Sequence, residues 1–190
     1  MPLKAPKTSS SRQMPEEKVH TALITSVVDI GSHYDDNYEK FKREIVVSLE
    51  FPNFIIKINN EDGTESEFTY VKSRMYTLSM HKKSNLRALV QQIIGKELSD
   101  DEAYEYDIFK IVGKPCMASV VHKQVGDKTY ANISTVMPLP DGFPPPKPVR
   151  EQFTYSIDES PKSVPEEVPE WMKELIVSSN EWEDADDLPL

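Results

Sequence analysis

The chain has 190 residues and a formal net charge of −10, a length that fits one domain of ordinary size with terminal extensions, or two very small domains. Ten of its fifteen prolines lie at or after Pro138, so we expect the hydrophobic core to be built before that point. The single cysteine, Cys116, excludes an internal disulfide, and no N-terminal apolar run resembles a signal peptide or a membrane span, so we expect a reducing cytoplasm.

Charge is distributed unevenly along the chain. Residues 166–190 contain nine acidic residues and one lysine, a net charge of −8, which leaves −2 for all preceding residues. Residues 67–150 contain twelve basic and nine acidic residues. The acidity therefore belongs mainly to the C-terminal segment, and the part before it can present a positively charged face.

The N-terminal third predicts an arm followed by two strands. Residues 1–20 contain Lys, Ser and Pro without hydrophobic periodicity, which predicts a disordered basic arm. The β-branched run over residues 21–31 predicts the first strand, and residues 32–42 have the composition of a loop. Alternating apolar residues over 44–51 predict the second strand.

A third β segment follows a break and a turn. Pro52 is expected to end the second strand, and residues 59–63 give a strong turn signal. The segment from Phe68 to Met80 is interrupted by polar residues at 72–74, so it can be one strand or two. Its even-numbered positions mix aromatic and basic side chains on one face, a pattern more typical of a ligand-binding face than of a core: Phe68, Tyr70, Lys72, Arg74, Tyr76 and Leu78.

Two helices are predicted next. Ser84 is a good N-cap and Gly95 stands at the C-terminal cap position, around an apolar stripe at helical spacing. Ser99 and Glu102 form a capping box for a second helix, and a short helical turn follows over residues 107–112. The acids at 100–102 are interpreted as first-turn residues that stabilise the helix dipole, rather than as metal ligands or catalytic groups.

Residues 113–137 give the clearest local prediction. Two β-branched, alternating runs flank Gly126 and Asp127, which predicts an antiparallel hairpin with a polar turn. Three strands, a helix and two strands in this order are the connectivity of the OB-fold. We therefore predict a mainly β protein with a five-stranded OB-fold barrel over residues 21–140, with a helix between strands three and four.

In an OB-fold, strands two and three and the loops joining strands one to two and four to five bind oligonucleotides. Basic residues neutralise phosphates, and aromatic rings stack on bases. A strand tyrosine can also be half-buried packing and a loop lysine can be simply solvated, but the clustering on one predicted face favours a ligand. The predicted DNA-binding residues are Lys42, Arg43, Lys72, Arg74, Tyr76, Lys123, Lys128 and Tyr130.

The C-terminal quarter differs in composition. Six prolines between 138 and 148 predict a stiff, extended linker, which we place at residues 141–165, before an acidic tail at 166–190. Residues 170–177, which follow Pro169, can form two amphipathic helical turns, too short to be stable alone.

The chain ends Asp186-Asp187-Leu188-Pro189-Leu190. This ending resembles the acidic tip of bacterial single-stranded DNA-binding proteins, Asp-Asp-Ile-Pro-Phe, and differs from it at two positions. In that family the tip docks replication and repair proteins. The resemblance implies a partner-binding site formed by Trp182, Asp186, Asp187, Leu188, Pro189 and Leu190.

The body, roughly residues 20–140, resembles phage-encoded single-stranded DNA-binding proteins through Ile24–Gly31, Tyr76–Leu86 and Gly113–Ile133. The resemblance implies non-catalytic, largely sequence-independent binding and protection of single-stranded DNA in phage replication, recombination or repair. The protein would act in the cytoplasm of an infected or lysogenic bacterial host, and a homo-oligomer is left open.

The sequence fits two other classes of protein less well. The four histidines lack metal-ligand spacing, and there is no cysteine pair, no phosphate-binding glycine loop and no nucleophile with an evident base. We therefore expect no catalysis, metal or cofactor. A phage virion or assembly adaptor with an inert β domain would explain the acidic tip, but not the basic and aromatic face.

Overall fold

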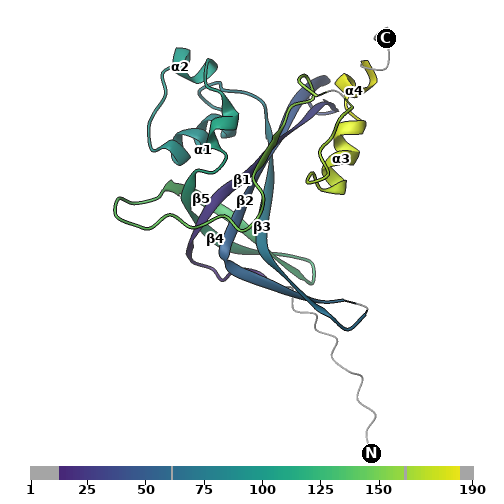
Figure 1. Cartoon of the computed structure of the whole chain (residues 1–190). Helices are drawn as coiled ribbons and strands as arrows, with labels where there is room; N and C mark the ends of the chain where they lie inside the picture. Colours follow the sequence, from purple (N-terminus) through teal and green to yellow (C-terminus); the bar gives the residue numbers. More distant parts are fainter. Residues whose placement is uncertain (1–12, 61, 161, 185–190) are drawn as a thin grey trace, which may run out of the picture.

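A curved β-sheet forms the centre of the protein and carries helices on both faces (Figure 1). The computed structural model describes residues 13–60, 62–160 and 162–184. The elements, in chain order, are β1 (Val19–Asp35), β2 (Lys40–Asn59), β3 (Glu65–Thr77), α1 (Asn85–Ile94), α2 (Asp100–Tyr104), the 3-10 turn η1 (Ile108–Ile111), β4 (Pro115–Val125), β5 (Lys128–Pro138), β6 (Phe153–Tyr155), α3 (Glu170–Val177) and α4 (Asn180–Asp184).

The strand order in the sheet is β3-β2-β1-β4-β5, with antiparallel neighbours, and β6 adds in parallel to β1. The predicted mainly β class is confirmed. A closed five-stranded barrel is not observed, because β3 and β5 stay at opposite edges of the described sheet. Helix α1 contacts both of these edge strands and lies between them.

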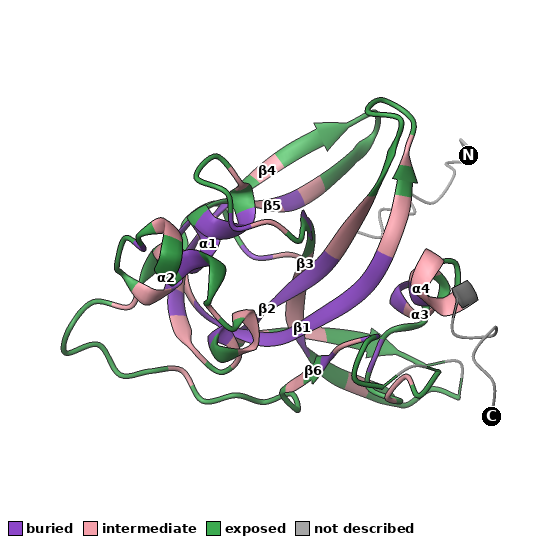
Figure 2. Ribbon diagram, turned by 90° about the horizontal axis from the view of Figure 1, so that it is seen from above, coloured by how far each residue is buried: buried purple, intermediate pink, exposed green. Residues whose placement is uncertain are grey.

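Strands β1 and β2 are longer than predicted. The expected loop over residues 32–42 is largely a continuation of their hairpin, in which Tyr34 pairs with Phe41 and Asp35 with Lys40. The Tyr34 and Phe41 rings meet edge to face, with centroids 5.4 Å apart, and such cross-strand aromatic contacts stabilise a hairpin. Figure 2 shows buried residues in the middle of β1 and β2 and exposed residues at the hairpin end.

The prediction that Pro52 ends the second strand is wrong. Strand β2 continues to Asn59, and a bulge between Phe51 and Ile55 leaves residues 52–54 without partners in β3. A bulge accommodates proline because no ladder hydrogen bond is needed there. Strand β3 is a single strand, which resolves the question left open by its polar residues at 72–74.

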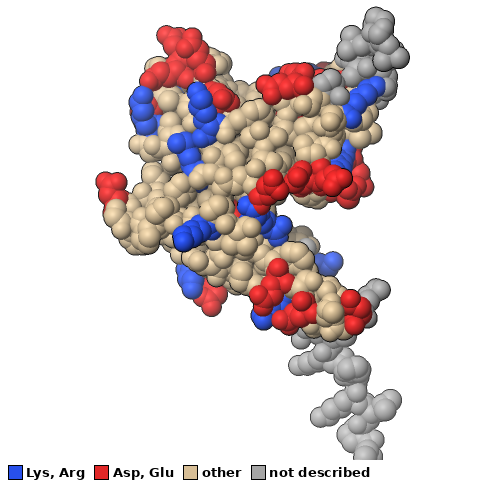
Figure 3. Space-filling view, viewed as in Figure 1, with Lys and Arg blue, Asp and Glu red and all other residues tan. Residues whose placement is uncertain are grey.

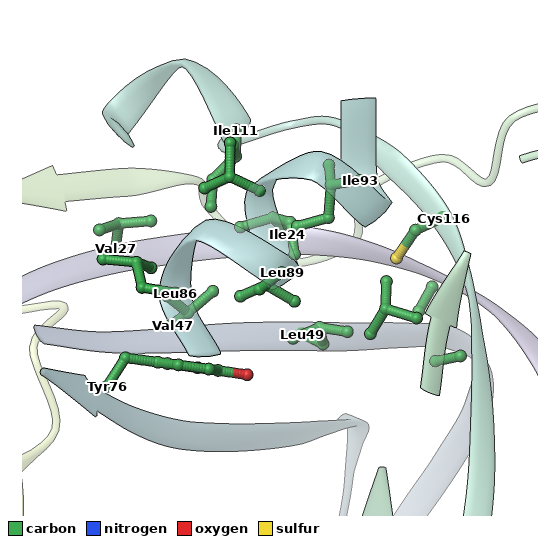
Figure 4. Close-up of a cluster of buried hydrophobic side chains, with 14 of the residues drawn as sticks. Ile24, Val27, Val47, Leu49, Tyr76, Leu86, Leu89, Ile93, Ile111 and Cys116 are labelled. Carbon is green, nitrogen blue, oxygen red and sulfur yellow. The ribbon is translucent and has the colours of Figure 1, made fainter. Parts of the chain in front are cut away.

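The main core lies between the sheet and α1 (Figure 4). The side chain of Ser84 accepts a hydrogen bond from the backbone N–H of Arg87, and Gly95 ends α1 with a φ of 68°, as predicted. The predicted capping box of α2, formed by Ser99 and Glu102, is also present. The apolar stripe of α1 packs on inward-facing residues of the sheet that include Ile24, Val47 and Leu49; the stripe consists of Leu86, Leu89, Val90 and Ile93.

A second core lies on the opposite face of β1 and β2. There Val28, Ile30 and Val46 are covered by the C-terminal part of the chain, through Tyr155, Ile157, Val168, Met172 and Ile176. In Figure 1, α3 and α4 lie across the sheet from α1.

The C-terminal segment therefore differs from the predicted linker and tail. Residues 153–155 form β6 beside β1, and residues 166–184 contain two helices packed against the sheet. Helix α3 is too short to be stable in isolation, but it gains stability by burying Met172 and Ile176. The tip, residues 185–190, lies outside the described residues.

A buried carboxylate anchors the return of this segment. Glu50 is fully buried and accepts hydrogen bonds from Thr69 Oγ1 at 2.7 Å and from the backbone N–H of Arg150 at 3.0 Å. The Arg150 guanidinium in turn donates to the carbonyl oxygen and the hydroxyl of Thr69. These bonds hold residue 150 against β2 and β3, where the sequence predicted a linker.

The N-terminal arm is docked as far as the structure describes it. The backbone N–H of Lys57 donates to the Gln13 side chain, and that side chain donates back to the Lys57 carbonyl, both at 2.8 Å. The ring of His122 bonds the Pro15 carbonyl at 2.8 Å. The predicted disorder is therefore wrong for residues 13–20, because hydrogen bonds tie them to β2 and β4. Residues 1–12 lie outside the described part.

The hydrogen bonds of the Glu102 carboxylate lead us to expect that the stability of the protein depends on pH. Its hydrogen bond from Lys96, together with those from Ser99, lowers the pKa of this carboxyl from 4.5 to about 2. Because the folded-state pKa is depressed, this contribution to stability is complete above pH 4.5 and is lost as pH falls towards 2. We expect Glu102→Gln to lower the melting temperature at neutral pH, with a difference from wild type that shrinks on acidification. Glu105→Gln is the control and should show no such trend.

Candidate functional site

A groove of about 660 Å³ runs between the edge strands β3 and β5, with α1 forming its third wall. Two cationic side chains and no acidic side chain line it, in a chain whose net charge is −10. Its lining residues are Leu49, Lys72, Ser73, Arg74, Met75, Tyr76, Asn85, Ala88, Leu89, Gln92, Asn132, Ile133, Ser134, Thr135 and Val136. The groove is therefore a local exception to the negative charge of the protein.

The β3 wall brings together three predicted site residues. Lys72, Arg74 and Tyr76 share one face of the strand, and their partners in β2 are Leu49, Val47 and Ile45, all of the main core. Because β3 is an edge strand, its long side chains can leave the core and reach the groove.

Tyr76 differs from Lys72 and Arg74 in how deeply it is buried. Arg74 is exposed, whereas Tyr76 is only 8% exposed and its ring lies among core side chains (Figure 4). Burial raises the pKa of Tyr76, and the Arg74 guanidinium lies 5.1 Å from the ring centroid. The structure does not support the prediction that this ring stacks on bases, because so little of the side chain is exposed.

The other two walls carry no charged side chain and mix polar with apolar residues. Asn85, Ala88, Leu89 and Gln92 follow one face of α1 at helical spacing. On β5, a bulge makes Ser134 an extra residue between the pairs Ser119–Thr135 and Val120–Ile133. Bulges redirect side chains at sites of function, and this one lies within the groove wall.

A second hollow of about 620 Å³ continues along the same edge of the sheet and shares Met75, Tyr76 and Asn85 with the groove. It adds His81 and Lys83, and one acidic residue, Glu44. The combined surface thus extends from β5 past α1 to the segment that connects β3 with α1.

The β4–β5 hairpin supplies the remaining predicted groups. The register pairs Lys123 with Tyr130 and Val125 with Lys128, so all four share one face, together with Asn132. Lys123 and Lys128 are exposed, and Tyr130 is half-buried. Because Asn132 also lines the groove, this basic face continues from it.

Lys42 and Arg43 are not part of this surface. Arg43 forms ion pairs with Asp29 at 2.5 Å and Asp158 at 2.7 Å, and the bond to Asp29 raises its pKa further. Lys42 pairs with Asp35 at 2.5 Å and lies 3.5 Å from the Tyr38 ring centroid. Neither residue lines the groove. Lys42 stabilises the β1–β2 hairpin, and Arg43 connects this hairpin to the C-terminal segment.

Several groups lie outside the predicted site residues. Tyr34, Tyr38 and Phe41 are exposed at the tip of the β1–β2 hairpin, a segment whose sequence indicated a loop with groups able to contact a ligand and whose structure is largely strand. The side-chain amides in the groove were also missed, because asparagine and glutamine carry no motif in the sequence.

Trp182, a predicted partner-binding residue, is half-buried against the second core. Helix α4 is held by the Glu181 carboxylate, which accepts hydrogen bonds from the Ser32 N–H at 2.7 Å and the Ser32 hydroxyl at 2.5 Å. Asp186, Asp187, Leu188, Pro189 and Leu190 lie outside the described residues.

The described part of the chain offers little support for metal binding, thiol chemistry or a membrane-spanning helix. Over residues 13–60, 62–160 and 162–184, no three His, Cys, Asp or Glu residues are arranged to hold a metal ion. Cys116 is buried, which raises its pKa to about 12 and keeps the thiol protonated. Among the described helices, none has the length and apolar character that crossing a membrane requires.

Charge separates over the surface. In Figure 3 acidic side chains gather over α2, beside the C-terminal helices and at the end of the β2–β3 hairpin, whereas no acidic residue lines the groove. No protein-family model matches the chain, and no curated protein matches it either.

Proposed function

We propose that the protein binds and protects single-stranded DNA without catalysis and largely independently of sequence, in phage replication, recombination or repair. One observation carries the proposal: a groove with two cations and no acids, continuous with a basic hairpin face, in an otherwise acidic protein. Such a surface attracts a polyanion, while the negative charge elsewhere disfavours general binding.

The shape of the surface favours a single strand. Its walls, β3, α1 and β5, surround a channel in which unpaired nucleotides can contact amides and apolar side chains. Lys72 and Arg74 neutralise phosphates inside the channel, and Lys123 and Lys128 continue the basic path along the hairpin. A double helix would present only its phosphates at the rim.

We propose further that the fold is an open form of the OB-fold. The strand order β3-β2-β1-β4-β5 would give the OB-fold barrel if β3 and β5 paired. Here α1 occupies the space between them, and the gap that it leaves is the binding groove.

In this proposal the acidic tip, Asp186–Leu190, recruits replication proteins in the cytoplasm of the bacterial host. Apolar side chains preceded by two aspartates suit a hydrophobic pocket with a basic rim on a partner protein. Helix α4 fixes the point on the body from which this tip begins.

The proposed function is tested by measuring, with fluorescence anisotropy, how tightly the protein binds oligo-dT and duplex DNA of equal length. The measurement is repeated at several salt concentrations. We expect the single strand to bind far more tightly, with log K falling against log salt by about 0.7 per neutralised phosphate. Equal affinity for duplex would contradict the proposal. Failure to bind either would favour the adaptor with an inert β domain.

A further inference from the structure

Three side-chain amides line the groove, and none has a hydrogen-bonding partner in the described residues. Asn85 and Gln92 come from α1, and Asn132 comes from β5. The amides of Gln91 and Asn60, by comparison, both bond to their own surroundings, Gln91 to Leu98 and Asn60 to Thr64. The groove therefore gathers amide donors and acceptors that the fold itself does not use.

The chemistry of the groove differs from wall to wall. Both cations, Lys72 and Arg74, stand on β3, whereas the three amides stand on α1 and β5. β3 and β5 are the opposite edges of the sheet, and α1 contacts both of them. A bound strand that satisfies both walls places its phosphates along β3 and its bases towards α1 and β5.

Aromatic stacking is not what this groove offers. Its one aromatic lining residue is Tyr76, and that ring is buried in the core. The apolar lining from Ala88 and Ile133 gives a base a surface to lie against, but no π-face. Bases in the groove must therefore be held by their edges.

We propose that Asn85, Gln92 and Asn132 bind the hydrogen-bonding edges of unpaired bases. This inference rests on the proposed function and adds how the bases are held. A side-chain amide carries a donor next to an acceptor, and base edges present the same arrangement. Paired bases have already used those edges, so the amides also select for single strands.

The test compares oligo-dT with an abasic strand of equal length, which keeps the phosphates but lacks the bases. We expect the wild-type protein to bind the abasic strand about fivefold or more weakly. The triple variant Asn85→Ala, Gln92→Ala, Asn132→Ala should lose most of this difference while keeping the salt dependence of the wild type. The changes on α1 leave the helix intact, because alanine is the best helix former.

The matched control is Asn59→Ala, an exposed residue at the end of β2 outside the groove, which should behave as the wild type. Thermal unfolding of each variant confirms that it is folded. If the abasic strand binds the wild type as tightly as oligo-dT, or if the triple variant keeps the full difference, the amides do not hold bases. A wild-type protein that binds neither strand would instead overturn the proposed function.

Discussion

Reversing the charge of the β3 wall, with Lys72→Glu and Arg74→Glu together, is expected to weaken single-stranded DNA binding about a hundredfold or more at low salt. Hydrogen bonds to charged groups contribute about 1.5 to 3 kcal/mol each, so the loss of two gives at least about 3 kcal/mol. The groove has no acidic lining residue in the wild type, and the double variant introduces two that repel phosphate. The salt dependence should become shallower, because fewer counterions are released on binding.

The measurement is an anisotropy titration with oligo-dT. A second double variant with the same net charge is titrated in parallel as the control. Lys110→Glu and Lys147→Glu change two exposed lysines that do not line the groove. This control should lose little affinity. If both double variants weaken binding equally, overall charge rather than the groove determines affinity, and the assigned site is wrong.

Truncation after Val164 is expected to destabilise the fold by about 5 kcal/mol or more. It removes Val168, Met172 and Ile176, each almost completely buried, and uncovers the sheet face at Val28, Ile30 and Val46. Burial of one such side chain contributes about 1.5 to 3 kcal/mol. Because small domains are stable by only about 5 to 15 kcal/mol, the truncated chain should be largely unfolded or aggregated.

The control is truncation after Asp184, which leaves both cores complete. Denaturant unfolding should show a near wild-type midpoint for this protein and a strongly reduced one for the shorter chain. The Asp184 truncation should also bind single-stranded DNA at least as tightly, since it removes two negative charges that oppose the binding of a polyanion, and should lose partner binding through the tip. A wild-type midpoint after truncation at Val164 would show that the C-terminal helices do not support the fold.

Several features were readable from the sequence because they depend on neighbouring residues. Ser84 and Gly95 set the ends of α1, as their local hydrogen bonding and backbone preferences require. Gly126 and Asp127 connect β4 to β5 as the two-residue turn that they predict. The alternation along β3 correctly placed Lys72 and Arg74 on one face, because side chains alternate strictly along a strand.

The same alternation could not show which of these side chains is buried. Lys72, Arg74 and Tyr76 share a face, yet α1 and β2 enclose only the tyrosine, and this depends on where a helix far along the chain packs. Arg43 was assigned to DNA, but its carboxylate partners Asp29 and Asp158 come from β1 and from beyond β6. Ion pairs across such separations leave no local pattern.

The sequence by itself thus determined the mainly β class, the helix ends, the hairpin turn and the cationic face of β3. Only the tertiary structure decided that β3 and β5 stay apart around α1, that β6 adds in parallel to β1, and that α3 covers the second face of the sheet. Prolines and acidic residues predicted an extended C-terminal segment because its few apolar residues cannot form a core alone. Val168, Met172 and Ile176 become buried because the sheet supplies the apolar surface that their own segment lacks.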